Sequence, residues 1–282
     1  FDWDINRSWN LDSGDDNDGW LSLSIESLSD AGVTLTSIAP ALQSMWHQSV
    51  GTLAQRDGVQ RSDNGTVGLW ARGFASSGDI EVSNNYETLS GFELDVDGSE
   101  LGIDFAVGEN VKLGLFAGSS SAEFDINSGI GQGDFDGDFV GAFIQYRSDS
   151  FVADFSYRDM DIDGHVLSGA VSEKVKGEID GYNIELGYTF ALESGLKIQP
   201  QLQLSEANLS LNNLADVETT YGYFTQAEGD SLQSRVGVMF SRDYVSGDDS
   251  WTPYLTVSSI DESDATNDYE INGLQGISDA GG

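Results

Sequence analysis

The feature that most constrains the fold is an alternation of apolar with small, polar or charged residues, repeated from residue 65 onward. Apolar residues occupy every second position of 101–107, 182–192, 196–204 and 236–240. A period of two is the pattern of a β-strand with one apolar face. Clusters of Gly, Asp, Asn and Ser separate the segments. We therefore predict about ten strands, which start near residues 67, 92, 111, 136, 151, 178, 196, 230, 251 and 266.

Both a soluble β-sandwich and a transmembrane β-barrel show this alternation, and three features favour the barrel. The segments approach the roughly 9–11 residues that a membrane-spanning strand needs. Aromatic residues gather near segment ends, as in an interfacial girdle: Tyr146, Phe151, Tyr157, Tyr182, Phe190, Tyr244, Trp251 and Tyr254. The polar faces carry charges that suit a wet lumen better than a sandwich core: Arg72, Asp104, Asp154, Arg158, Glu185 and Arg235. We predict an all-β fold, a transmembrane antiparallel β-barrel.

The connections between the predicted strands are of two kinds. Residues 108–110, 148–150 and 193–195 are short, whereas 79–91, 125–136, 161–178 and 208–229 are long and rich in Asp, Ser and Gly. Outer-membrane barrels combine short periplasmic turns with longer outer loops. The long segments are therefore expected to be outer loops.

One helix is expected before the strands. Leu42, Met45, Trp46, Val50 and Leu53 form one apolar stripe at helical spacing. Ser37 suits the N-cap, Pro40 the first turn, and Gly58 a position just past the end.

The length and polarity of this helix indicate where it lies. A helix of about 18 residues is about 27 Å long, close to the thickness of a bilayer's hydrocarbon core. It is too polar to face lipid, because it also carries Gln43, His47, Gln48 and Arg56. We predict one α-helix inside the barrel lumen.

The first 27 residues are predicted to form two short strands around an acidic turn at 12–19, followed by a polar linker to about residue 37. No signal peptide is visible and Phe1 is not a start residue, so we expect a processed N-terminus.

Charge and composition exclude several functions. The 282 residues have 12 basic and 48 acidic side chains, a formal net charge of −36. Binding to nucleic acid by charge is therefore excluded, and an acidic surface instead suits water, divalent cations or a basic partner. No cysteine is present, so disulfides and thiolate metal sites are excluded.

The sequence predicts no catalytic residues and no resident cofactor. His47 and His165 are the only histidines, and no GxSxG motif is present. An outer-membrane protease site would have to combine His165 with Asp161, Asp163 or Asp79, which is retained only as an alternative.

Asp-rich segments at 95–98, 134–138 and 159–164 are expected to be solvated turns. Segment 159–164 opens like a calcium loop, but Ala170 stands where a bidentate Glu is required. At most weak calcium binding is expected there.

Several segments, taken in order, carry a family resemblance. TLAQRDG (52–58) and GLWARG (68–73) are followed by LGIDFAVG (101–108) and VGAFIQYRSDSFVADFSY (140–157). GYNIELGYTFAL (181–192), LKIQPQLQL (196–204), SLQSRVGVMFSRDY (231–244) and WTPYLTV (251–257) complete the series. Together they resemble the translocator end of a monomeric (type V) autotransporter. FDWDI and WLSLS near the N-terminus resemble the closing strands of a pertactin-like passenger β-helix.

The resemblance implies a domain organisation. Residues 1–34 would be the end of the passenger, 35–60 the pore-spanning helix and 61–282 the barrel. The family's barrel has twelve strands and ends in an aromatic residue, whereas about ten strands are predicted here. Because an open sheet edge is not tolerated in lipid, we expect the natural protein to continue beyond Gly282. Self-cleavage, which some family members perform at an Asn-Asn bond, is not expected, because residues 38–57 contain no asparagine.

The implied function is to anchor a secreted passenger in the bacterial outer membrane and to assist its export to the cell surface, with the helix plugging the pore. The implied partners are outer-membrane lipid, the protein's own passenger and the barrel assembly machinery. Two alternatives remain: a barrel whose acidic outer loops bind a surface partner, and the ten-stranded kind of outer-membrane protease.

Overall fold

The computed structural model describes residues 2–4, 24–52, 55, 67–84, 91–169, 171–212, 217–219, 222–246, 249–262, 267–271 and 274–279. The predicted roles of Arg56 and Gly58, and the acidic turn at 12–19, lie outside the described residues. The two predicted N-terminal strands are confirmed: β1 (Asp2–Asp4) pairs antiparallel with β2 (Ser24–Ser27).

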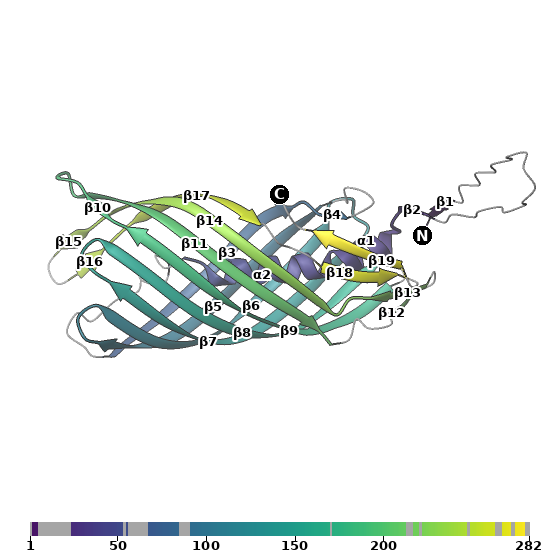
Figure 1. Cartoon of the computed structure of the whole chain (residues 1–282), viewed down its shortest axis with the longest axis horizontal. Helices are drawn as coiled ribbons and strands as arrows, with labels where there is room; N and C mark the ends of the chain where they lie inside the picture. The colour runs from purple at the N-terminus through teal and green to yellow at the C-terminus, as the bar shows by residue number, and fades with distance from the viewer. Residues whose placement is uncertain are drawn as a thin grey trace, which may run out of the picture.

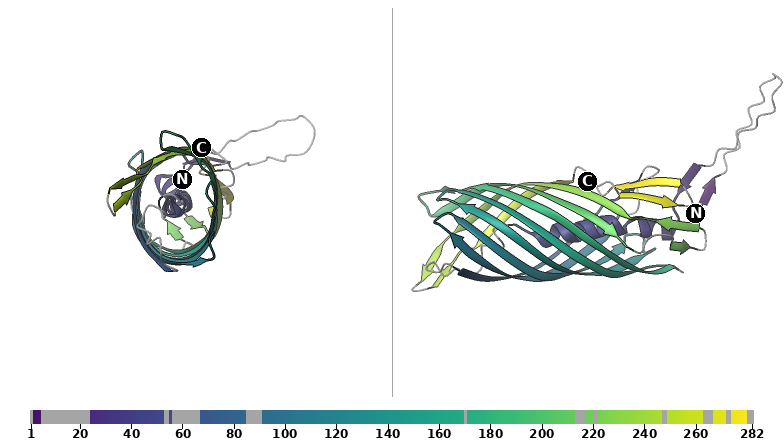
Figure 2. Two further views of the ribbon diagram at one scale, coloured as in Figure 1. Left: turned by 90° about the vertical axis from the view of Figure 1, so that its left-hand side faces the viewer. Right: turned by 60° about the horizontal axis from the view of Figure 1, so that its bottom comes forward.

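Nine long strands form one curled antiparallel sheet, in which each strand pairs with the next one along the chain. They are β3 (Val67–Ile80), β5 (Phe92–Val107), β6 (Val111–Ile126), β7 (Gln132–Arg147), β8 (Phe151–Ser168), β9 (Val171–Tyr188), β11 (Leu196–Leu211), β14 (Glu228–Arg242) and β17 (Tyr254–Glu262). The strands run obliquely and enclose a helix (Figures 1 and 2). Within the described part of the chain, β3 and β17 are the edges of this sheet. The predicted antiparallel barrel with a helix in its lumen is confirmed.

The tenth predicted strand, near residue 266, lies outside this main sheet. β18 (Asn267–Ile271) and β19 (Leu274–Asp279) form a hairpin in a second sheet with β12 (Val217–Thr219), β13 (Gly222–Thr225) and β4 (Ser83–Asn84). Figure 1 shows this second sheet at the end of the ring where the first helix lies. The residues near 266 were predicted to add a strand to the barrel wall, but they form part of the second sheet at that end of the ring instead.

The alternation in the sequence places every second side chain in the lumen. In β7, Phe135, Phe139 and Phe143 are buried, whereas Val140 between them is 61% exposed. Inward aromatic rings occupy the space over glycines of neighbouring strands. A Cβ on Gly141 would lie 2.2 Å from the ring of Phe116, so this close approach requires glycine.

The outward face of the sheet has two zones. Towards the turns at 108–110 and 148–150 it carries exposed apolar side chains, for example Leu101, Leu115, Ile144, Phe155 and Leu186. Towards the opposite end it carries exposed carboxylates, for example those of Asp97, Glu123, Asp136, Asp161 and Glu178. The apolar zone matches the lipid-facing band of an outer-membrane barrel.

The prediction that the Asp-rich segments are turns is wrong. Residues 95–98, 134–138 and 159–164 all lie inside strands β5, β7 and β8. Their acids point outward, and the residues between them, such as Val96, Phe135 and Ile162, are buried. The apolar residues at alternate positions therefore decide the structure, not the turn propensity of Asp and Gly.

Two of the predicted long loops are wrong for the same reason. The connection between β6 and β7 is limited to residues 127–131, and only residues 169 and 170 separate β8 from β9. The other two, after β3 and after β11, contain the short strands of the second sheet.

Among the described residues, two helices of more than one turn are present where one was predicted. α1 (Asp30–Thr36) occupies the predicted linker, and α2 (Ile38–Val50) follows it. The hydroxyl of Ser29 caps α1 by accepting from the Gly32 amide at 3.3 Å. The Ser37 hydroxyl does not cap α2, because it donates to the Val33 carbonyl at 2.8 Å. α2 ends before the predicted position, at Gly51, where φ is 64°.

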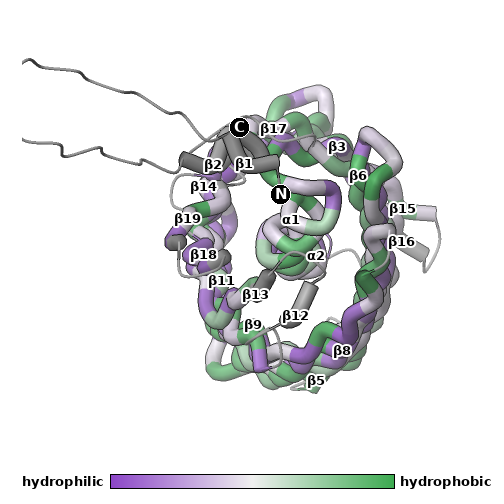
Figure 3. The backbone as a smooth tube through the Cα atoms, turned by 90° about the vertical axis from the view of Figure 1, so that its right-hand side faces the viewer, coloured by the Kyte–Doolittle hydropathy of each residue, from purple (hydrophilic) through white to green (hydrophobic). Residues whose placement is uncertain are grey.

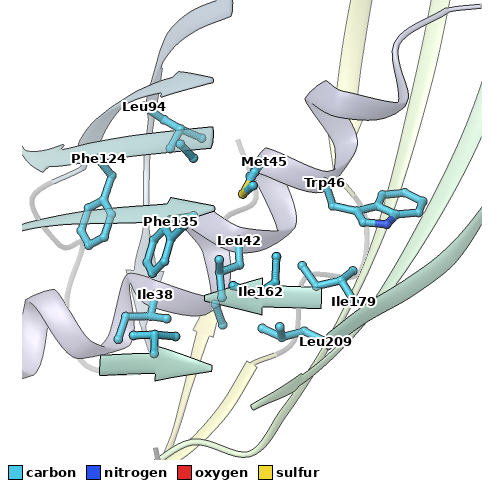
Figure 4. Packing of buried hydrophobic residues seen from close by; sticks show 14 of the residues in the cluster. Ile38, Leu42, Met45, Trp46, Leu94, Phe124, Phe135, Ile162, Ile179 and Leu209 are labelled. Carbon is cyan, nitrogen blue, oxygen red and sulfur yellow. The ribbon is translucent and has the colours of Figure 1, made fainter. Parts of the chain in front are cut away.

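The apolar side of α2 packs into the wall of the lumen (Figure 4). Ile38, Leu42, Met45 and Trp46 are all fully buried. They lie among wall side chains from strands on several sides: Leu94, Phe124, Phe135, Ile162, Ile179 and Leu209. Full burial of each large apolar side chain contributes about 1.5–3 kcal/mol, so this contact fixes one side of the helix. Among the described residues, no helix is long and apolar enough to span a membrane.

Candidate functional site

The C-terminal turn of α2 is held by two arginines of the wall. Arg72 on β3 donates through Nη1 to the Val50 carbonyl at 3.0 Å and through Nη2 to the Ser49 carbonyl. Arg158 on β8 donates to the Ser49 hydroxyl. The last carbonyls of a helix lack intrahelical partners and carry the negative end of its dipole. The two guanidinium groups therefore satisfy and neutralise this end of the helix.

Glu100 on β5 joins the two arginines. Its Oε1 lies 3.3 Å from Arg72 Nε, and its Oε2 lies 2.9 Å from Arg158 Nη2. Glu100 is 1% exposed, and both arginines are also buried. Arg158 also lies over the ring of Phe139, 4.0 Å from its centroid. Three strands thus bring one carboxylate and two guanidinium groups together at the helix end; we call Arg72, Glu100 and Arg158 the clamp.

A second contact attaches the side of α2 to three other strands. His47 lies between the hydroxyls of Ser205 on β11, 3.0 Å from Nδ1, and Ser231 on β14, 2.8 Å from Nε2. Ser231 donates its proton to Glu262 on β17. Its oxygen is then the acceptor for an Nε2 proton of His47, which leaves Nδ1 to accept from Ser205.

A third contact joins α2 to the hairpin of the second sheet. The Gln43 amide nitrogen donates to Asn267 Oδ1 at 2.9 Å, and the Asn267 amide nitrogen donates back to Gln43 Oε1 at 3.0 Å. Both side chains are fully buried. Gln48, one turn further along, accepts from the Ser76 hydroxyl of β3. The polar side of α2 is therefore matched to the wall at several levels.

The remaining predicted lumen residues lie on the wall beside or beyond the helix end. Asp154 on β8 stands directly opposite Glu185 on β9, and each is 2% exposed. Asp104 is 3.7 Å from Lys112 Nζ. Arg235 lines a cavity next to α2.

This cavity has a volume of about 670 Å³ and lies between α2 and strands β3, β14 and β17. Most of the residues that line it are polar, and they include His47, Gln48 and Gln55 from the helix side, and Arg235 and Glu262 from the wall. The helix thus lies in the lumen without filling all of it. Figure 3 shows α1 and α2 inside the ring of strands.

Several residues of this site were not among those predicted. Glu100 could have been found, because it lies four positions before Asp104 on the same face of one strand. Gln203, which donates to the Gly51 carbonyl at 2.7 Å, lies on the polar face of the predicted strand 196–204. No local signal identifies Asn267, because its partner Gln43 is 224 residues away. Arg56 lies outside the described residues.

The described part of the chain holds no group of three or more His, Cys, Asp or Glu residues arranged to bind a metal ion. His165 lies within β8, not in a loop, and its Nε2 is 2.9 Å from the Ser172 hydroxyl.

Known proteins match this architecture. Residues 69–282 match the family model described as "Autotransporter beta-domain". Pertactin autotransporter of Bordetella parapertussis is 27% identical over 241 residues, which cover 82% of this chain and 25% of that protein. The pertactin autotransporter of Bordetella bronchiseptica matches equally. The chain thus spans about a quarter of the length of these relatives.

Two solved structures share the fold. The β-domain of the Bordetella autotransporter BrkA has a TM-score of 0.53 at 18% identity, and the match covers 76% of this chain and 97% of that one. The transport unit of AIDA-I from Escherichia coli has a TM-score of 0.59 at 15% identity, covering 86% and 82%. Because the family match extends over far more than half of the sequence, this chain belongs to the autotransporter β-domain family and is a translocator domain of the outer membrane.

Proposed function

We propose that α2 is a resident plug of the translocation pore, and that the clamp holds it at the end of export. The observation that carries this proposal is the pair of buried arginines at the end of α2, with Glu100 between them: Arg72 bonds the last two carbonyls, and Arg158 bonds the Ser49 hydroxyl. A buried charge cluster of this kind favours a single arrangement of its members, because a buried charge that loses its partner is strongly destabilising. The cluster is therefore complete only with the helix inside.

The other helix contacts support the same role. His47 and Gln43 each use both of their polar atoms on wall or hairpin residues. Gln48 contributes to the same polar side of α2 through its bond from Ser76, and the predicted role of Arg56 lies outside the described residues. Asp104, Asp154, Glu185 and Arg235 are proposed as a polar lining of the pore, which keeps it hydrated when a passenger chain passes through.

We further propose that residues 1–34 are the end of the passenger, 35–60 the pore segment and 61–282 the barrel. The passenger enters the pore ahead of α1 and emerges at the end of the ring where α1 begins, which makes that end the cell-surface end. The lipid of the outer membrane faces the apolar outward zone, and the barrel assembly machinery is the proposed partner in insertion. The domain itself is proposed to anchor and export, not to catalyse a reaction.

A cross-linking experiment on the intact protein tests the plug. Gln43→Cys with Asn267→Cys places two thiols at positions whose side chains touch, in a chain that has no other cysteine. We expect a short bifunctional thiol reagent to cross-link this pair in outer membranes, and the resulting protein to be closed to ions.

The matched control is Gln43→Cys with Ser121→Cys, because Ser121 is exposed on the outer face of β6. This pair should not cross-link. Equal cross-linking of the two pairs, or none of either, would contradict a helix held in the pore.

A further inference from the structure

The connection between β14 and β17 departs from a simple turn. Residues 243–253 contain a hairpin of β15 (Tyr244–Ser246) and β16 (Asp249–Trp251). It lies at the end of the ring opposite α1 (Figure 1), and it projects outward from the ring in the end view of Figure 2. By contrast, the connections 108–110 and 148–150 at the same end are three-residue turns.

The hairpin presents apolar and aromatic side chains to its surroundings. Val245 is 76% exposed and Trp251 58% exposed. Tyr244 and Trp251 are directly opposite each other, and their rings stack with centroids 4.6 Å apart. Arg242, just before the hairpin, lies 5.4 Å from the centroid of the Tyr244 ring.

The base of the hairpin is fixed to the wall. Asp243 accepts from Lys197 on β11 and from the Thr252 hydroxyl at 2.9 Å. The bond from Lys197 holds the pKa of Asp243 below its usual value, so this attachment is charged at neutral pH. The outward direction of the hairpin is therefore set by contacts of its own base.

The same rim carries two further exposed aromatic pairs. Tyr146 and Phe151 flank the turn between β7 and β8, with centroids 6.2 Å apart. Tyr188 ends β9 and Phe190 begins the short strand β10 (Phe190–Ala191), with ring centroids 4.9 Å apart. Aromatic rings with a polar group are enriched where a membrane meets water. The hairpin therefore continues an interface that the barrel already forms with lipid.

We propose that the β15–β16 hairpin is an interfacial foot, which lies among the phospholipid headgroups of the periplasmic leaflet. Tyr244, Val245 and Trp251 enter the boundary between headgroups and acyl chains, and Arg242 is placed to meet lipid phosphate. The strand amides of the hairpin tolerate this depth because the headgroup layer is hydrated, unlike the hydrocarbon core. The foot would resist tilting and axial displacement of the barrel while a passenger chain is exported. The proposal rests on the barrel being in the outer membrane.

Depth-dependent quenching tests this placement in the intact protein, reconstituted in phosphatidylcholine vesicles. Val245→Cys carries an environment-sensitive fluorophore, and it is compared with two matched positions. Leu202→Cys lies in the outward apolar zone, and Ser121→Cys lies in the outward acidic zone. The quenchers are a nitroxide on the lipid headgroup, a nitroxide deep on the acyl chain, and a water-soluble quencher.

The fluorophore at Val245→Cys should lose most of its emission to the headgroup nitroxide and little to the deep one. That at Leu202→Cys should respond to the deep nitroxide, and that at Ser121→Cys chiefly to the aqueous quencher. If Val245→Cys responds only to the aqueous quencher while Leu202→Cys responds to lipid, the foot is refuted and the barrel placement stands. If Leu202→Cys also fails to respond to lipid, the membrane placement itself fails.

Discussion

Replacement of Glu100 by Gln should open the pore, because Glu100 balances two buried guanidinium charges at the end of α2. Gln keeps the size of the side chain and removes its charge. With the helix in place, Arg72 and Arg158 would then be buried without the carboxylate that joins them. When the helix leaves, water reaches both arginines, so the loss of Glu100 costs much less in that state. The penalty therefore falls mainly on the plugged state.

The magnitude follows from the partners that remain. Removal of one member of a buried ion pair costs about 3–5 kcal/mol. Arg72 would keep two helix carbonyls, and Arg158 would keep the Ser49 hydroxyl and the Phe139 ring. The lower end, about 3 kcal/mol, is therefore expected. Since 1.4 kcal/mol corresponds to a factor of ten, the open population should rise about 100-fold.

Single-channel recording of the intact protein in planar bilayers measures this population directly. The matched control is Glu123→Gln, which makes the same change at an exposed outward position of β6. Addition of Arg158→Gln to Glu100→Gln removes one of the two guanidinium charges and should restore part of the closed state. If Glu100→Gln opens no more often than Glu123→Gln, the clamp does not hold the plug.

Further substitutions test the other helix contacts. Trp46→Ala removes a fully buried ring and should weaken the packing of α2 in the lumen by about 3–5 kcal/mol. Residues 37–52 should then be digested faster by protease, and an unchanged rate of digestion would exclude a packing role. Gln43→Leu leaves the buried amide of Asn267 unpaired, which costs about 1–3 kcal/mol. The double variant with Asn267→Leu should recover part of this loss in thermal unfolding, and strictly additive losses would argue against coupling. Glu185→Leu or Arg235→Leu should loosen the plug by disturbing the charge balance of the pore lining, and unchanged conductance would count against that role.

The general architecture could be predicted because it depends on local alternation. The polar faces of the strands identify Arg72 and Arg158 as inward-facing without any knowledge of their partners. The same rule, applied to the segments around Asp136 and Asp161, would have kept them in strands. Turn propensity was given precedence there, and the predicted loops were too long as a consequence.

The detailed site could not be predicted, because it depends on register and long-range pairing. Glu100 meets Arg158 only because the register of the intervening strands β6 and β7 places the two residues at the same level along the barrel axis. Asn267 meets Gln43 through the fold of the second sheet. The early end of α2 is marked locally by Gly51, whose φ of 64° suits a glycine, but no local pattern shows that Arg72 bonds the last carbonyls.

The acidic outward zone marks the part of the barrel that lies outside the membrane. It leads to two predictions in which the melting temperature changes in opposite directions. Asp138 stands directly opposite Asp161, and such like-charged pairs are destabilising by about 0.2–1 kcal/mol. They are tolerable only in water, where ions screen them over about 10 Å at 0.1 M salt. Asp138→Asn should therefore raise the melting temperature at low salt, and the gain should shrink as salt is added. Lys176 instead pairs with Asp163 at 2.6 Å amid these acids, so Lys176→Gln should lower the melting temperature under the same conditions. Shifts of the same sign, or shifts that salt does not reduce, would show that repulsion between these strands does not govern the stability of the outer end.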